Sequence, residues 1–171
     1  MKITKIVQFT FAVVALALIS PARAETMSVP SKEKAEFTFE VPSGWKPKGD
    51  TDDESVEASS PDDHAYLMAW LTKGGDEKAL AKDLETTLKD SMKSVDAGYQ
   101  EKVIEQHGTK FIVVSGSGVD KREGSKVKFL VGIFPVGDGQ AGIVYADYDS
   151  DAPAGTMETL EGILKSIKVA K

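Results

Sequence analysis

The sequence predicts an α+β protein built on an antiparallel β-sheet of about six to seven strands flanked by helices. Three observations support this prediction. Residues 65–71 are apolar on both faces of a strand, as expected for a central strand that is covered on both sides. Between 99 and 149, short segments are joined by glycine-containing turns, which is typical of consecutive hairpins. Apolar residues recur at helical spacing after 76 and again after 153.

Before the first helix, the sequence divides into short strands separated by turn-forming residues. Residues 36–41 alternate between polar and apolar, which is typical of a strand with one solvated face near the edge of a sheet. The segment 46–54 is acidic and rich in turn formers, which favours an exposed loop. The expected order is a polar lead-in over 28–34, the strand over 36–41, a turn at 42–45, the acidic loop, a strand over 55–59, a turn at 61–63 and the central strand.

The rest of the chain predicts a helix, a meander of four strands and a closing helix. The first helix begins after Asp76 as N-cap and continues to Val95, with Gly98 just beyond its C-terminus. Its apolar stripe comprises Leu80, Leu84, Leu88, Met92 and Val95. The strands of the meander are expected over 99–105, 109–119, 126–136 and 141–149. The closing helix is expected over 153–167, with one apolar stripe.

The N-terminus has the three parts of a secretory signal peptide in the usual order. Lys2 and Lys5 precede an apolar run over 9–19, and the small-residue site Ala22-Arg23-Ala24 follows. The apolar run is shorter than the roughly 20 residues of a membrane-spanning helix. The chain contains no cysteine to carry a lipid anchor. We therefore expect cleavage after Ala24, a single mature domain over 25–171 without a stable membrane anchor, and a periplasmic or secreted location.

Charge and cysteine content exclude several classes of function. The net charge is −6, and the predicted signal peptide carries basic residues only, so the mature chain is more acidic still. An acidic protein repels phosphate backbones, which argues against a nucleic-acid partner. The absence of cysteine removes disulfides, thiol catalysis and thiolate metal sites together.

Two motifs resemble those of a known group of proteins. The first is Phe37-x-Phe39-x-Val41-Pro42-x-Gly44-Trp45, and the second is the closing Leu160-x-x-Ile163-Leu164-x-Ser166-Ile167. With the acidic loop and the helix before the meander, they resemble the PsbP-like superfamily, which includes extrinsic photosystem II proteins, a nuclear Ran-binding relative and DcrB-like bacterial envelope proteins. The DcrB-like branch is the nearest. The resemblance implies the fold and an accessory or binding role, and it supplies no catalytic or binding residue.

The acidic run after the meander suggests a calcium site. Asp147, Asp149, Asp151 and Glu158 fall at the first, third, fifth and twelfth positions of an EF-hand loop. Ala152 stands where that loop needs glycine, and a strand precedes the run where a helix should. The alternative is that Asp147 and Asp149 end a strand and Asp151 caps the last helix. No other cofactor is predicted.

The remaining candidate sites have simpler interpretations. Gly137-x-Gly139-x-x-Gly142 matches a dinucleotide-binding fingerprint in its letters, but a strand follows it where a helix is required, so it predicts a hairpin. The group Asp62-Asp63-His64 and the other histidine, His107, fall at turns. Gly116-Ser117-Gly118 lacks the spacing of a nucleophile elbow. We therefore expect the protein not to be an enzyme.

Three functional hypotheses stay open on the sequence. The first is a noncatalytic periplasmic accessory or binding protein that engages another envelope protein or a small ligand. The second is a metal-dependent or hydrolytic enzyme that uses the acidic run or the histidines. The third is an inhibitor or immunity-type protein that docks on a basic partner through its acidic loop. The residues of that loop are Asp50, Asp52, Asp53 and Glu54.

Overall fold

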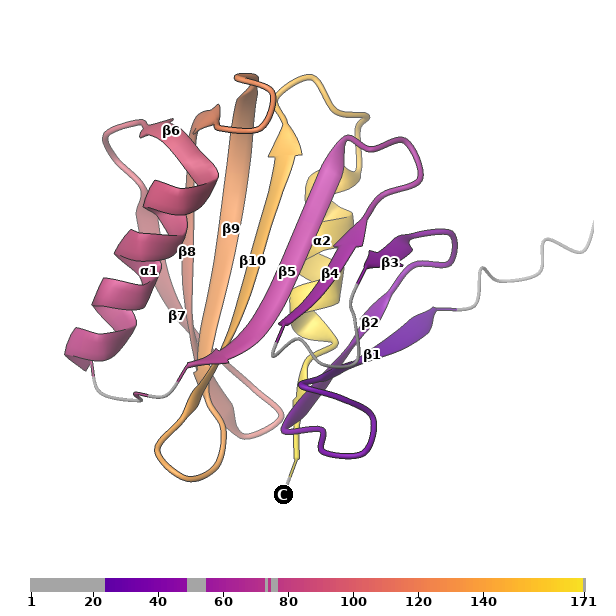
Figure 1. The fold of residues 1–171 in the computed structure, drawn as a ribbon, viewed down its shortest axis with the longest axis vertical. Helices are drawn as coiled ribbons and strands as arrows, with labels where there is room; N and C mark the ends of the chain where they lie inside the picture. The colour runs from indigo at the N-terminus through magenta and orange to yellow at the C-terminus, as the bar shows by residue number, and fades with distance from the viewer. Residues whose placement is uncertain (1–23, 49–54, 73, 75–76, 171) are drawn as a thin grey trace, which may run out of the picture.

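An eight-stranded antiparallel sheet forms the centre of the molecule (Figure 1). The computed structural model describes residues 24–48, 55–72, 74 and 77–170. The strands lie in the order β3-β4-β5-β10-β9-β8-β6, and β7 also pairs with β8. Their bounds are β3 Lys46–Lys48, β4 Ser55–Ser59, β5 Ala65–Thr72, β6 Met92–Val95, β7 Gln100–Gln106, β8 Thr109–Asp120, β9 Lys126–Pro135 and β10 Ala141–Asp149. The predicted antiparallel sheet is confirmed.

A second, three-stranded sheet has the order β1-β2-β11, with β1 at Glu25–Val29, β2 at Phe37–Val41 and β11 at Lys168–Val169. The strand predicted near a sheet edge, β2, is therefore a middle strand, and that prediction is wrong. β1, β3, β6 and β11 were not predicted as strands, and β3 lies at the start of the segment that was predicted to be an exposed loop. The described residues hold eleven strands in two sheets, more than the six to seven expected of one. The excess comes from short strands without a clear alternating pattern.

One face of the large sheet is covered by the small sheet and by helix α2, Thr156–Lys165. Phe37, Phe39 and Val41 of β2 are fully buried there, beside Leu160 and Ile163 of α2. The hydroxyl of Ser166 adds a polar tie, since it accepts a hydrogen bond from the backbone N–H of Glu40 at 2.8 Å. This face is the main core of the protein. Neither helix in the described ranges is long and apolar enough to cross a membrane.

Within the part of the chain that the structure describes, the opposite face of the large sheet is covered by one helix, α1, at Glu77–Ser91 (Figure 1). The helix ends four residues before the predicted Val95, because Met92–Val95 leave the helix and pair with β8 as β6. Gly98 accordingly lies in the β6–β7 loop, at φ 95°, and not at a helix C-terminus. One 15-residue helix covers only part of an eight-stranded sheet. This incomplete cover produces the candidate site.

The meander has the turns that the sequence predicts. His107 and Gly108 take φ 51° and 78° between β7 and β8, and Asp138 and Gly139 take φ 54° and 70° between β9 and β10. These left-handed conformations suit glycine and aspartate and close tight hairpins. The fingerprint-like segment 137–142 is thus a hairpin, as expected. The four meander strands align β10 beside β5, which brings the ends of distant segments together.

Candidate functional site

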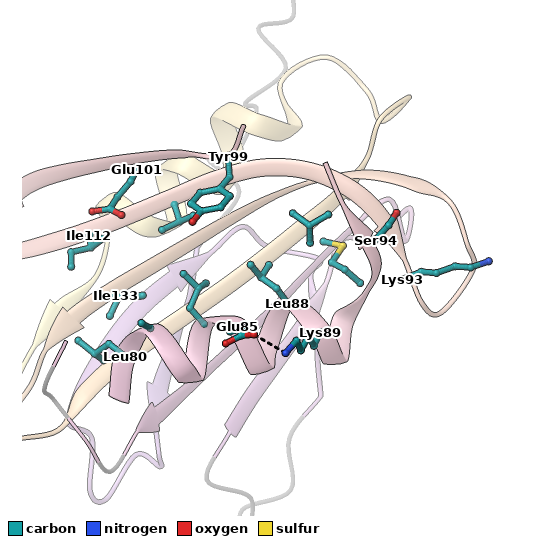
Figure 2. A pocket seen from close by; sticks show the side chains of 15 residues that line it. Leu80, Glu85, Leu88, Lys89, Lys93, Ser94, Tyr99, Glu101, Ile112 and Ile133 are labelled. Carbon is teal, nitrogen blue, oxygen red and sulfur yellow. Dashed lines mark hydrogen bonds and ion pairs between the residues drawn. The ribbon is translucent and has the colours of Figure 1, made fainter. Parts of the chain in front are cut away.

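A cleft of about 920 Å³ separates α1 from the outer half of the sheet (Figure 2). Leu80, Leu84 and Leu88 form one wall along the helix. Ile112, Val114 and Ile133 of β8 and β9 form the facing floor. The three leucines are only partly buried, although their helical spacing is that of a core-facing stripe. The cleft therefore exposes apolar surface that neighbouring elements of the fold do not cover.

The same region holds the exposed large apolar side chains of the described residues. Val95, Tyr99 and Val103 are 37%, 57% and 62% exposed, and they lie on β6, the β6–β7 loop and β7. Val103 pairs in register with Ile112, so its side chain lies on the sheet face that carries the cleft. Clustered apolar exposure of this kind marks binding surfaces more often than scattered exposure does.

A charged cluster lies on the same face of the sheet as the cleft, near the C-terminal end of β10. Asp147 is 3% exposed, and it accepts hydrogen bonds from the Tyr145 hydroxyl and the Arg122 guanidinium, both at 2.8 Å. The guanidinium also lies 4.4 Å from the centre of the Tyr66 ring. Burial raises the pKa of Asp147, because lost hydration outweighs the attraction of Arg122. Each buried polar side-chain atom of this cluster has a hydrogen-bond partner. The cluster therefore holds the 120–125 turn against the sheet.

His64 and Asp149 form a second polar group near the end of β10. His64 Nδ1 lies 2.9 Å from Asp149 Oδ2, and this hydrogen bond raises the pKa of the imidazole. The Ser125 hydroxyl lies 3.0 Å from Asp149 Oδ1 and 2.6 Å from Asp120 Oδ2, so its single proton is shared between two carboxylates and is closer to Asp120. The Asp149 carboxylate thus lies between the Ser125 hydroxyl and the His64 imidazole. A hydrolytic triad needs the histidine in the middle, where it takes the serine proton, so this arrangement cannot activate Ser125.

The predicted calcium ligands do not converge as a single group in the described structure. Asp149 and Asp151 lie with His64, and their ligand atoms are within 4.8 Å of one another. Asp147 is engaged by Arg122, and Glu158 lies on α2 near Tyr148, whose side chain belongs to the core on the other face of the sheet. No sequence pattern places His64 beside the acidic run, because His64 precedes β5 and the run ends β10, which is distant in the chain. Calcium binding stays a prediction.

The other sequence candidates are dispersed. Asp62 Oδ1 accepts hydrogen bonds from the Ser60 hydroxyl and from the backbone N–H of His64, and Asp63 pairs with Lys46 at 3.2 Å. Neither carboxylate belongs to the group that the His64 imidazole forms with Asp149 and Asp151. Ser117 donates to Asp96 at 2.7 Å in β8. The acidic residues Asp50, Asp52, Asp53 and Glu54, and the N-cap candidate Asp76, lie outside the described residues, as does the signal peptide up to residue 23.

Solved structures of known proteins share this arrangement, although no family model and no curated protein matches the sequence. Cyanobacterial PsbP from Synechocystis aligns at a TM-score of 0.60 and 13% identity, over 92% of this chain and 99% of that chain. The Ran-binding protein Mog1p of Saccharomyces cerevisiae aligns at 0.55 and 10%, over 86% of this chain and 96% of that chain. The chain has the PsbP/Mog1 fold.

A third protein with this fold comes from Bacteroides thetaiotaomicron. It aligns at a TM-score of 0.52 and 15% identity over 80% of this chain, which spans 46% of that protein's length. In this fold α1 lies beside the outer strands of the meander, and the cleft of about 920 Å³ lies between them. We therefore take this cleft as the candidate functional site.

Proposed function

We propose that this protein is a noncatalytic binding protein that works outside the cytoplasm and takes an apolar ligand into the cleft beneath α1. The observation that carries the proposal is the partial burial of Leu80, Leu84 and Leu88, which face Ile112 and Ile133 across the cleft. Burying their apolar surface would stabilise a complex by about 25 cal/mol per Å². A ligand that fills the cleft gains this stabilisation without reorganising the core.

The proposal of a noncatalytic role is supported by the hydrogen bonding of the two polar clusters. Asp147 is fastened to Arg122, and Asp149 stands between Ser125 and His64 in an order that cannot activate the hydroxyl. The fold neighbours support a binding role, since Mog1p is named as a Ran-binding protein. An envelope location and a relation to the DcrB-like proteins extend the proposal. They are supported by the signal-peptide pattern and by the sequence resemblance.

Divalent-cation binding is a second candidate, favoured by the grouping of His64, Asp149 and Asp151. An imidazole and two carboxylates are ligands for zinc as well as for harder cations. Titrating calcium and zinc separately into the protein, with Asp151→Asn as the variant, tests this candidate and the calcium prediction together. A rise in Tm with one ion that Asp151→Asn removes would support that ion. Unchanged Tm values at millimolar calcium and micromolar zinc would reject both.

Uptake of an environment-sensitive apolar dye tests the main proposal. N-phenyl-1-naphthylamine fluoresces strongly in apolar surroundings, and we expect the protein to bind it one to one. Ala81 is exposed and lines the cleft, so Ala81→Trp should block the dye without disturbing the core. Thr86→Trp is the matched control, since Thr86 is exposed on the same helix and does not line the cleft. Absence of binding by the unaltered protein, or equal binding by the folded Ala81→Trp variant, would contradict the proposal.

A further inference from the structure

The two ends of the cleft differ in charge. Figure 2 shows Leu80, Ile112 and Ile133 toward one end, and Lys89 and Lys93 toward the other. Most of the side chains between them are leucine, methionine, isoleucine and valine, and Glu85 and Tyr99 also line the cleft, so the interior offers a mainly apolar path that ends at ammonium groups. This polarity matches an elongated ligand with an apolar body and one anionic end.

Three lysines gather around the C-terminal end of α1, in a chain whose net charge is −6. Lys89 pairs with Glu85 at 2.6 Å. The Lys121 ammonium donates to the carbonyl of Lys89, and its backbone N–H donates to the carbonyl of Ser91 at 2.9 Å. Lys93 is exposed and takes part in none of the ion pairs found among the described residues. Because Glu85 offsets the charge of Lys89 and Lys121 does not line the cleft, Lys93 is the cation that is left for a ligand at the cleft mouth.

The acidic residues near this end offset part of that charge. Glu85 offsets the charge of Lys89, and Asp96 keeps its negative charge while it accepts the hydroxyl hydrogen bond of Ser117. Asp90 lines a different hollow, together with Arg122. Glu101 also lines the cleft, and Figure 2 shows it at the end that carries Ile112. An anionic group is therefore attracted most strongly by Lys93 at this end of the cleft.

The interior favours a hydrocarbon chain over an extended peptide. Strands β8 and β9 under the cleft pair with each other and with their outer neighbours, so their ladder N–H and C=O groups are already used. An extended peptide would face its own backbone polar groups toward leucine, isoleucine and valine, which is costly without partners. A hydrocarbon chain carries no such groups. The volume of about 920 Å³ falls within the range of about 300–1,000 Å³ that is usual for small-molecule sites.

We propose that the ligand is a fatty acid, with its hydrocarbon chain along Leu80, Leu84 and Leu88 and its carboxylate at Lys93. This inference rests on the proposed function, which requires only that the cleft bind an apolar ligand. Each methylene group buried strengthens binding about fourfold. The carboxylate adds roughly fivefold through exposed, salt-screened ion pairs.

Isothermal titration calorimetry with three amphiphiles of one chain length tests the inference. Dodecanoate, dodecanol and dodecyltrimethylammonium are titrated below the concentrations at which they aggregate. We expect dodecanoate to bind about fivefold more tightly than dodecanol, the cationic amphiphile to bind most weakly, and decanoate to bind more weakly than dodecanoate. Added salt should reduce the preference for dodecanoate.

Charge reversal at the cleft mouth locates the head group. Lys93→Glu should abolish the preference for dodecanoate, and Lys93→Gln should reduce it. Lys32→Glu is the matched control, because Lys32 is an exposed residue between β1 and β2 that does not line the cleft. Only variants whose Tm matches that of the parent protein are compared, so that a folding defect is not mistaken for a binding defect. An unchanged preference in Lys93→Glu would overturn the assignment of the head group.

The remaining outcomes separate this inference from the proposed function. Equal binding of the three amphiphiles would overturn the fatty-acid assignment and leave an apolar site. Dye binding without amphiphile binding, or displacement of the dye by an apolar helical peptide alone, would also overturn it and keep the site. Failure of both dye and amphiphiles to bind would reject the proposed function itself.

Discussion

At the scale of single residues, the contact between Arg122 and Asp147 shows how burial and charge oppose each other. The Asp147 side chain is 5% exposed and the Arg122 side chain 52% exposed, so one partner has lost its water and the other has kept much of it. Removing the cation leaves a buried carboxylate with only the Tyr145 hydroxyl as a donor. The cost of such an orphaned charge commonly exceeds the net value of the pair.

Arg122→Ala should therefore lower the free energy of unfolding by about 2 kcal/mol at neutral pH, less than for a fully buried pair because solvent screens Arg122. Asp147→Asn should cost less than Arg122→Ala, since the amide oxygen still accepts hydrogen bonds without a buried charge. Urea unfolding of both single variants and the double variant measures this. The idea fails if the Arg122→Ala variant is as stable as the parent.

The pH dependence of stability follows from the same residue. Because the pKa of Asp147 is raised in the folded state, its contribution is most favourable below the ordinary value of 3.8 and is lost as pH rises through the folded pKa. Asp147→Asn should remove this loss, so that its stability relative to the parent improves from pH 4 to pH 7. Urea titrations at several pH values measure the trend, with the exposed Asp63→Asn as control. A constant difference between Asp147→Asn and parent would contradict it.

At the scale of elements, two glycines have opposite surroundings. A Cβ at Gly118 in β8 would lie 2.3 Å from the carbonyl oxygen of Ser94, a backbone atom of β6 that cannot rotate away. A Cβ at Gly162 in α2 would meet nothing within 4 Å. The first glycine allows β6 to approach β8, which places Lys93 and Val95 at the cleft, and the second makes no packing contact that needs its small size.

Gly118→Ala should destabilise the protein by about 1–3 kcal/mol, because β6 must move. Gly162→Ala should stabilise it by about 0.5–1 kcal/mol through helix propensity and the reduced freedom of the unfolded chain. Thermal and urea unfolding measure whether each variant is less or more stable than the parent protein. A neutral Gly118→Ala variant would show that β6 is free to shift.

Helices α1 and α2 differ in how firmly they are held. Ile163 of α2 is 2% exposed, whereas Leu84 of α1 is partly buried. Ile163→Ala should cost about 2–5 kcal/mol and Leu84→Ala about 1 kcal/mol, since a half-exposed site leaves little cavity. Amide exchange should be faster in α1 than in α2. Equal protection of the two helices would contradict this difference.

Local patterns predicted most elements and missed those that depend on partners. The strands over 55–59 and 141–149 match β4 and β10, because alternation, double apolar faces and turn residues agree there. Met92 and Val95 continue the apolar spacing of α1, so the sequence predicts a longer helix. Met92 is buried in the core as the first residue of β6, and its apolar character does not distinguish a strand from a helix. β11 spans two residues and forms only because β2 is available to pair with it.

At the scale of the whole molecule, the candidate site depends on how helix α1 and the large sheet pack together. The spacing of the α1 leucines is typical of core residues, and they face a cleft because the helix covers the eight-stranded sheet incompletely. The grouping of His64 with Asp149 likewise depends on the β5–β10 register. Sequence spacing carries no signal for such contacts. The acidic run was recognisable, but its partners were not.

Export is also a property of the whole chain. Expressed with its N-terminus intact in a bacterium that has a general secretion pathway, the protein should be recovered from the envelope with Glu25 as its first residue. Intact-mass measurement of the purified product gives the cleavage position. Replacing apolar residues of 9–19 by charged ones should leave the uncleaved chain in the cytoplasm. Full-length protein in the cytoplasm of the unaltered strain would contradict the assignment.

The small sheet joins regions near both ends of the fold, because Lys168 and Val169 pair with Thr38 and Phe37. Bringing such distant segments together requires closing a long loop, and non-local pairing of this kind slows folding. β2 has partners on both sides only when residues 168–169 have reached it, so the three-stranded sheet cannot be completed from the N-terminal segment alone.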